Sequence, residues 1–350
     1  MRPPPPLRQK ATRLTTPFNS LPKSHKDADA LIRAVCAVAG SLSFLDEIDE
    51  EIHHAGLDRA VASGKTPPVF DWLLTAFSFQ GISDRVARTY MEKHGTASWS
   101  RMEASLEASP TCQKLQTFWD YAGCRYDKGS FTCAEPDHID ACPVPRPRLR
   151  NGRLNQTAYS LFLFVRDIAG GDLVGWIDSQ LEAATGSSIA DLEAARQEAL
   201  IGPLRGVFGV SDKVLTMALS SLLIGARHHR VVWFETGKVM IAIDTLVHNF
   251  LHRTGILESC GAPHRYGPAC YAGGGCAEII RGAADRIDAR SFNPRFPKIF
   301  PRFVQHAIWR YCAAEGLDLC NGNRIDDRQR CQINYCYLFE TCGRKPLKSM

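Results

Sequence analysis

Apolar side chains recur at helical spacing along most of this chain, and no segment shows sustained alternation of apolar and polar residues. Phe70, Leu73, Leu74 and Phe77, for example, fall on one face of a helix. Most of the other periodic segments begin after a capping residue or end at a glycine. These further helices are expected over 84–93, 156–169, 189–200, 245–254 and 303–314. The sequence therefore predicts an all-α fold in which strands are minor.

Composition sets the broad class of the protein. Its 350 residues are 45% hydrophobic and 23% charged, which is typical of a globular chain with one large domain or two lobes. Residues 1–26 contain six prolines and several basic residues but no apolar signal core, so we expect a disordered basic tail. The longest apolar run, 214–226, is too short for a bilayer. A cytoplasmic protein without a membrane span is predicted, and its net charge of +5 permits a nucleic-acid partner without arguing for one.

Two short segments carry the chemistry. In the segment 206–215 (GVFGVSDKVL), Gly206 and Gly209 surround a turn between helical sequences, where backbone N–H groups can approach a phosphate. Ser211 follows the turn, and Lys213 opens the next helix. In the segment 240–255 (MIAIDTLVHNFLHRTG), Asp244 directly follows an apolar run. Each segment alone is ordinary, because glycines are common in turns and an aspartate before a helix is commonly an N-cap.

Together and in this order, the segments resemble the helix–hairpin–helix DNA glycosylase superfamily, in its endonuclease III branch. Residues 209–213 match the hairpin, 243–245 match the aspartate motif, and 253–254 match a later Arg-Thr. Residues 70–80 look like the first barrel helix of that family, which ends in a glutamine, here Gln80. The likeness covers roughly residues 68–346. Phe208 replaces the family proline and Ser211 the second hairpin glycine, while 124–153 and 227–239 look like insertions, so the chain would be a divergent member.

The resemblance implies a monomeric bifunctional DNA glycosylase and AP lyase that acts on damaged or modified bases in double-stranded DNA. Lys213 would attack C1′ of the sugar and form a Schiff base, which requires a neutral amine. Asp244 would stabilise the oxocarbenium-like sugar and help to deprotonate the lysine. Gln80 would fill the space left by the flipped base, and Gly206, Gly209 and Ser211 would contact DNA.

The same resemblance implies two lobes with the active site between them. One is a helical barrel over 68–230 that ends in the hairpin, and the other combines 27–67 with 231–350. Three alternatives remain open beside a bifunctional repair enzyme. They are a monofunctional glycosylase, a non-catalytic DNA-binding protein on the same fold, and an enzyme that acts on invasive DNA with unusual bases. For the individual residues, the alternatives are a solvated phosphate contact at Lys213 and a helix cap at Asp244.

Cysteines are the other informative feature, because eight of the 13 lie between Cys260 and Cys342. In a reducing compartment such clustering favours metal binding over disulfides. Cys320, Cys331, Cys336 and Cys342 resemble the four-cysteine loop that holds a [4Fe–4S] cluster in the endonuclease III branch, with zinc as the alternative and Cys312 as a fifth contender. Two further groups are weaker zinc candidates, with ordinary thiols as the alternative. They are Cys124, Cys133, His138 and Cys142, and Cys260, Cys270 and Cys276 with His264.

Overall fold

The protein is predominantly helical. A computed structural model describes residues 25–39, 44–79, 84–107, 112–127, 132–134, 142, 144 and 153–348. These residues form sixteen α-helices and one pair of two-residue strands, β1 (Tyr126–Asp127) and β2 (Thr132–Cys133), which pair antiparallel. The predicted all-α class with minor strands is confirmed.

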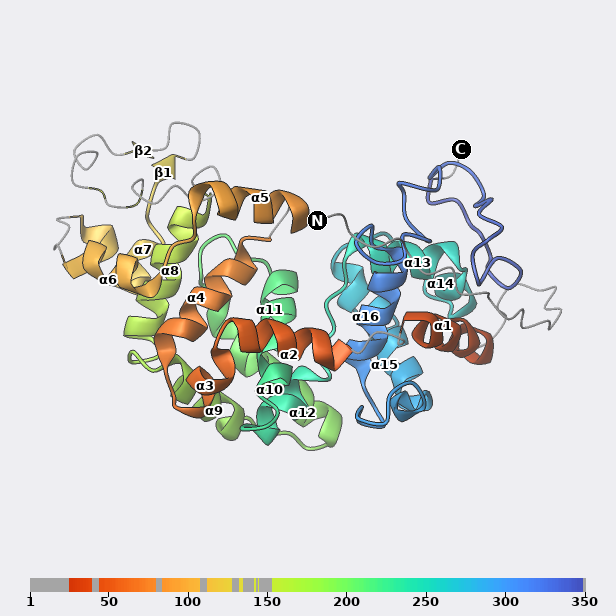
Figure 1. Cartoon of the computed structure of the whole chain (residues 1–350), viewed down its shortest axis with the longest axis horizontal. Helices are drawn as coiled ribbons and strands as arrows, with labels where there is room; N and C mark the ends of the chain where they lie inside the picture. Colours follow the sequence, from red (N-terminus) through yellow and green to blue (C-terminus); the bar gives the residue numbers. More distant parts are fainter. Residues whose placement is uncertain are drawn as a thin grey trace, which may run out of the picture.

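The larger of two lobes lies on the left in Figure 1 and runs from α2 to α12. Helix α11 (Asp212–Gly225) is its centre, because it packs against α2, α4, α10 and α12. The remaining helices of this lobe are α2 (Phe44–His54), α3 (Leu57–Ala62), α4 (Thr66–Phe77), α5 (Asp84–His94), α6 (Trp99–Glu107), α7 (Phe118–Tyr121), α8 (Arg153–Asp167), α9 (Leu173–Ala183), α10 (Ile189–Leu204) and α12 (Val231–Gly237).

The smaller lobe contains the first helix and the C-terminal third of the chain (Figure 1). Its central helix α16 (Pro301–Cys312) packs against α1 (His25–Ala39), α13 (Thr245–Arg253) and α15 (Cys276–Arg286). Helix α14 (Ile256–Ser259), the 3₁₀ helices η4 (Pro268–Tyr271) and η5 (Ala289–Ser291) and the irregular segment 313–348 complete this lobe. Helices α2, α3 and α12, which were expected with the C-terminal residues, have their main contacts with helices of the larger lobe. The expected bounds of the two lobes stay a prediction.

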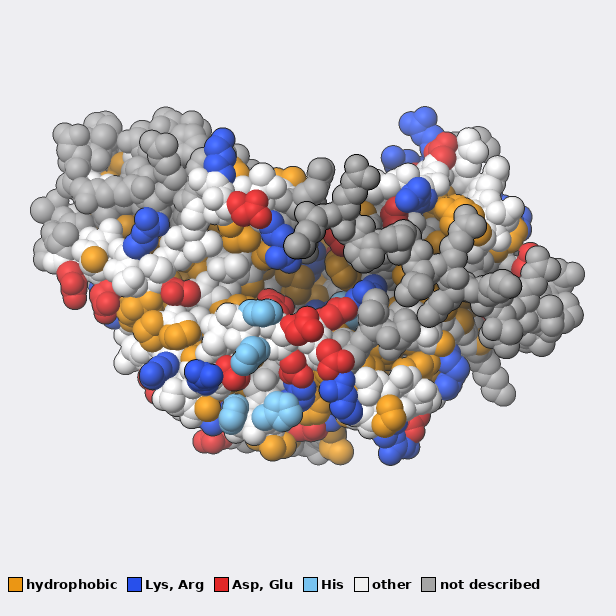
Figure 2. Space-filling model, viewed as in Figure 1, with side chains coloured by type: hydrophobic (Ala, Val, Ile, Leu, Met, Phe, Trp, Pro, Cys, Tyr) orange, Lys and Arg blue, Asp and Glu red, His pale blue; other side chains and the backbone are white. Residues whose placement is uncertain are grey.

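The two lobes meet at α2. Its first residue, Phe44, packs its ring against Phe300 and Phe303, at centroid distances of 5.7 and 6.4 Å. The other face of α2 is acidic, and Figure 2 shows red side chains gathered over this helix between the lobes. Asp46 pairs with Arg295 and Glu47 with Arg310, two arginines of the smaller lobe. Aromatic packing and charge pairs therefore act together at this junction.

Several local sequence signals are confirmed. Phe70, Leu73, Leu74 and Phe77 are all buried on α4, as their spacing predicted. The Ser188 side chain caps α10 by accepting a hydrogen bond from the Asp191 amide at 3.1 Å.

No single helix in the described ranges is long and apolar enough to cross a membrane. One bent pair, Asp27–Ala39 with Phe44–His54, is long and apolar enough when its two helices are counted together.

A glycine in α11 provides a test of this packing. A Cβ atom on Gly225 would lie 2.3 Å from Cγ1 of Ile52 in α2, so the two helices need a glycine to pack this closely. We expect Gly225→Ala to lower the free energy of unfolding by about 1–3 kcal/mol, measured by urea denaturation.

Gly202→Ala in α10 is the matched control. Its added methyl group would meet the flexible ends of two side chains, the Glu198 carboxylate at 3.0 Å and the Arg205 guanidinium at 4.0 Å. There the better helix propensity of alanine should leave the stability unchanged or raise it by up to about 1 kcal/mol. Equal effects of the two substitutions would contradict the close α2–α11 contact.

Candidate functional site

The turn between α10 and α11 has the glycine-dependent geometry that the sequence predicted. Gly209 has a φ of +77°, in the left-handed region that favours glycine. The backbone of Phe208 is held by α8, because its carbonyl accepts from the Thr157 hydroxyl at 2.8 Å and its amide donates to Ser160 Oγ at 2.9 Å. Lys213, the second residue of α11, is therefore presented from a well-anchored turn.

The predicted DNA-contacting residues of this turn have different surroundings. Gly209 and Ser211 are exposed, and Ser211 is the N-cap position of α11. Gly206 has a packing reason to be glycine, since a Cβ there would lie 2.9 Å from the Phe118 ring. Gln80 lies outside the described residues. A DNA contact by any of these residues stays a prediction.

Asp244 is a helix cap whose carboxyl also feels the charge of Lys213. Its Oδ1 accepts a hydrogen bond from the Val247 amide at 2.9 Å, at the start of α13. Burial raises the pKa of the Asp244 carboxyl, and this amide and the Lys213 ammonium each lower it in part. The capping role is therefore confirmed, and the catalytic pairing of Asp244 with Lys213 stays a prediction.

A second cation near Asp244 was missed by the sequence reasoning. Arg302 of α16 is buried, and its guanidinium donates to Ser220 of α11 at 2.9 Å and to Gln305. Burial lowers the pKa of Arg302 to about 10, and the Asp244 carboxylate opposes that shift. Its only sequence signal was an arginine at the start of an apolar helix.

The four C-terminal cysteines of the predicted cluster loop are close enough to affect one another. Burial raises the pKa of Cys342 to about 12, and the thiols of Cys320, Cys336 and Cys331 raise it further. Burial and the neighbouring Cys320 raise the pKa of Cys312, the fifth contender, well above its usual range, whereas Cys312 lowers the pKa of Cys320.

Backbone and side-chain groups around these sulfurs also contribute. Tyr311 Oη lies 3.0 Å from Cys336 Sγ, and the Arg344 amide donates to Cys342 Sγ at 3.3 Å. The loop itself docks on the end of α13, because the amides of Gly343 and Lys345 donate to the carbonyls of Thr254 and Arg253 at 3.0 and 2.8 Å.

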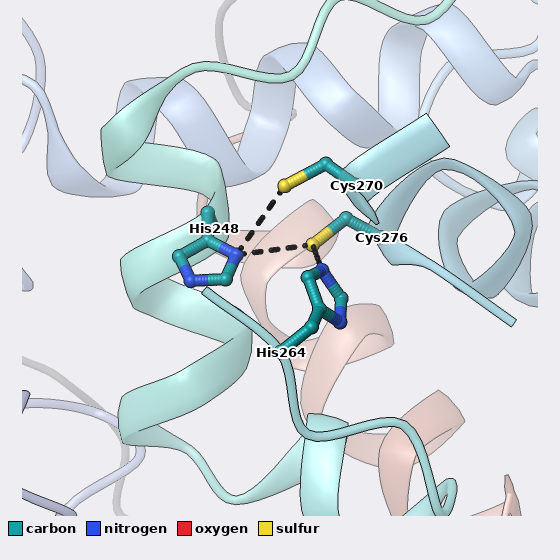
Figure 3. A group of neighbouring side chains, drawn as sticks. All are labelled: His248, His264, Cys270 and Cys276. Carbon is teal, nitrogen blue, oxygen red and sulfur yellow. Dashed lines mark hydrogen bonds between the residues drawn. The ribbon is translucent and has the colours of Figure 1, made fainter. Parts of the chain in front are cut away.

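A separate group, His248, His264, Cys270 and Cys276, could hold a metal ion, and its ligand atoms all lie within 4.8 Å of one another. In Figure 3 the two imidazoles and two thiols point toward a common centre. His248 comes from α13, His264 from the loop after α14, Cys270 from η4, and Cys276 is the first residue of α15. In the described part of the chain, no other set of three or more histidine, cysteine or acidic side chains is this closely spaced.

The outcome for the weaker cysteine predictions is mixed. Cys270, Cys276 and His264 come together as predicted, but the fourth member is His248, not Cys260. Cys260 is instead near Asp29 and Arg286. In the other group, burial raises the pKa of Cys142 to about 11, and the nearby Cys133 and Cys124 contribute to this rise. His138 lies outside the described residues, so that group stays a prediction.

The chain matches no protein-family model, no curated protein and no solved structure. The site is therefore interpreted from its own residues and their geometry.

The raised pKa of Asp244 makes a prediction about stability. A carboxyl whose pKa is raised by folding lowers stability as pH rises from its unfolded-state pKa through its raised folded-state pKa, and the full penalty is present above the raised value. Asp244→Asn removes the charge and keeps a good N-cap acceptor. We expect its melting temperature at pH 7.5 to equal or exceed that of the wild type, with a difference that narrows as pH falls through the raised pKa.

Asp172→Asn is the matched control, because Asp172 is an exposed N-cap that accepts from the Gly175 amide at 2.9 Å. It should show no gain at any pH, since its charge is already in water. A marked loss of stability in Asp244→Asn would show that the carboxylate is mainly structural.

Proposed function

We propose that the protein is a bifunctional DNA glycosylase with AP-lyase activity on damaged or modified bases in double-stranded DNA. The observation that carries this proposal is that Lys213 and Asp244 stand at the starts of α11 and α13, in different lobes, with the lysine near enough for its charge to lower the pKa of the carboxyl. A helix cap alone would not require a half-buried lysine in the neighbourhood of a carboxyl whose pKa burial has raised. The resemblance of the surrounding motifs to the glycosylase superfamily adds the substrate class.

The chemistry assigns a separate role to each residue. The neutral Lys213 amine attacks C1′, the C1′–N bond to the base breaks, and the base leaves with that electron pair and takes up a proton. Asp244 accepts the proton that the amine loses and stabilises positive charge on the sugar. Opening of the sugar ring gives an imine between Lys213 and C1′. Loss of a C2′ proton then expels the 3′ phosphate, and water releases the product.

The surroundings of Asp244 suit a carboxylate that must hold a charge while partly buried. Burial disfavours the ionised form, whereas the Val247 amide, Lys213 and the buried Arg302 favour it. A carboxylate under these opposing effects interacts strongly with a developing positive charge, because little water screens it. This environment supports a catalytic role beside the capping role.

The C-terminal cysteines fit a [4Fe–4S] cluster better than a single zinc ion. Their thiols influence one another, yet their sulfurs are not close enough together to bind one ion, unlike the His248 group. An iron–sulfur cube places four irons between its thiolates and therefore needs wider spacing. The cluster would be held by Cys320, Cys331, Cys336 and Cys342, and would order the loop on which the exposed Arg324, Arg328 and Arg330 lie. Those arginines could then contact DNA phosphates.

The loop predicts a specific metal content. Protein purified without oxygen should contain about four irons and four sulfides per chain. Cys336→Ser should lose most of this iron, whereas Cys260→Ser, a half-buried cysteine outside both groups, should retain it. Zinc instead of iron in this loop would contradict the cluster. Loss of iron in Cys312→Ser would make Cys312 a ligand.

Borohydride trapping tests the enzyme directly. Duplex oligonucleotides with an abasic site or a panel of oxidised bases are incubated with the protein and sodium borohydride, which reduces an imine to a stable amine. We expect a covalent adduct with wild-type protein, none with Lys213→Ala, and a yield at least tenfold lower with Asp244→Asn. Lys298→Ala, an exposed lysine of the smaller lobe, should leave the adduct unchanged.

The other outcomes separate the remaining readings. Release of free base without an adduct would identify a monofunctional glycosylase. Tight duplex binding with neither product, across the whole panel, would identify a DNA-binding protein on this fold. An adduct that persists in Lys213→Ala would assign the nucleophile to another residue.

A further inference from the structure

We propose that His248, His264, Cys270 and Cys276 bind one zinc ion, and that this zinc fixes the loop between α14 and α15 against α13, where it positions Asp244. The zinc site rests on the four side chains alone. Its consequence for Asp244 rests in addition on the proposed function.

Distances within the group match those of a tetrahedral zinc site. His248 Nδ1 lies 3.3 Å from Cys276 Sγ and 3.5 Å from Cys270 Sγ, and His264 Nε2 lies 3.3 Å from Cys276 Sγ. Zinc bonds of about 2.3 Å to sulfur and 2.0–2.1 Å to nitrogen, at tetrahedral angles, place sulfur and nitrogen about 3.5 Å apart. The side chains therefore need little movement to accept the ion (Figure 3).

The histidine tautomer and the burial of the group also suit a metal. His264 Nδ1 lies 2.7 Å from the carbonyl of Ala262, so its N–H is used there and the Nε2 lone pair faces the thiols. Cys270 and Cys276 are fully buried, and His248 is 5% exposed. Three buried polar side chains and the half-buried His264 thus have one another as partners, and a shared ion explains this arrangement.

The donor set selects zinc. Two thiolates and two imidazoles, with no carboxylate among them, form the four-coordinate set typical of structural zinc. Both thiols release a proton on binding, and the two thiolates then neutralise the 2+ charge of the ion. The buried site therefore carries no net charge, which removes the main electrostatic penalty of burying a metal.

The loop that supplies His264 and Cys270, and that leads directly into Cys276, buries few of its own side chains. Between 261 and 275, Cys270 and Gly275 are the buried residues, and the other side chains are exposed or half-buried. Gly274 has a φ of +77°, and a Cβ on Gly275 would lie 2.3 Å from the Ala269 carbonyl, so the turn between the cysteines needs glycine. A segment with so little apolar burial requires another source of stability, and a metal ion supplies it.

This loop is connected to the proposed catalytic residue through Tyr271, which directly follows Cys270. The Ile243 amide donates to the Tyr271 hydroxyl at 2.8 Å, and that hydroxyl donates to the Ile243 carbonyl at 3.3 Å. Ile243 directly precedes Asp244. Zinc at Cys270 would therefore hold the backbone that sets the position of the Asp244 carboxylate, while His248 holds the helix that Asp244 caps.

Elemental analysis of the full-length, untagged protein tests the site. We expect one zinc per chain in the wild type and in Cys260→Ser, and less than a tenth of that in Cys276→Ser and His264→Ala, with iron unchanged in all four. Retention of zinc by Cys276→Ser, or a wild type without zinc that takes up none when it is added, would overturn the site.

A second test uses cobalt in the wild-type protein, so that its result does not depend on whether a variant folds. Wild-type protein loaded with Co²⁺ alone should show the visible bands of tetrahedral cobalt and thiolate-to-cobalt charge transfer. His264→Cys, which keeps four donors, should still bind and show a stronger charge-transfer band. Octahedral spectra, or bands without thiolate character, would overturn the site.

Tyr271→Phe tests the positioning role separately. It should retain zinc and bind abasic duplex within twofold of the wild type, yet form the borohydride adduct about tenfold more slowly. An unchanged rate would overturn the positioning role while the zinc content still stands. If wild-type protein holds zinc but forms no adduct with any lesion, the proposed enzyme fails and the metal site does not.

Discussion

Helix α13 is the element on which the rest of the site depends. It has only nine residues. Asp244 caps its start, His248 lies near its middle, and it ends at the buried Arg253. Arg253 forms an ion pair with Asp327, and its carbonyl accepts from the Lys345 amide, so the C-terminal loop docks on the last turn. A helix this short is marginal in isolation. Its position is therefore set by what binds to its two ends and its middle.

Buried arginines extend this constraint across the lobes. Arg302 lies in the first turn of α16, in the smaller lobe, but its guanidinium donates a hydrogen bond to the Ser220 hydroxyl of α11. Its backbone amide donates to the carbonyl of Lys238, just after α12, at 2.9 Å. A buried guanidinium without such partners would cost several kcal/mol. The relative placement of α11 and α13, and with it the approach of Lys213 to Asp244, thus follows from satisfying one cation at the junction.

The sequence predicted what depends on local chemistry and missed what depends on distant contacts. Periodicity placed the buried face of α4, and capping chemistry placed the starts of α10 and α13. The packing of α2 on α11 depends on a close approach at Gly225, which no spacing in the sequence reveals. Cys270, Cys276 and His264 were recognisable from their density, whereas His248 lies more than a dozen residues earlier, within an ordinary amphipathic helix.

Two thiol-rich groups on one small lobe have a common physical cause. The segments 261–275 and 313–348 contain no α-helix and few buried apolar side chains, so hydrophobic burial alone gives them little stability. Both nevertheless contact α13, one at its middle and one at its end. If such segments were held only by exposed hydrogen bonds, they would open readily, and α13 would lose its fixed position. Metal coordination at the two proposed sites would add stability without requiring a larger core, and it would help α13 to hold the partly buried Asp244 carboxylate in one place.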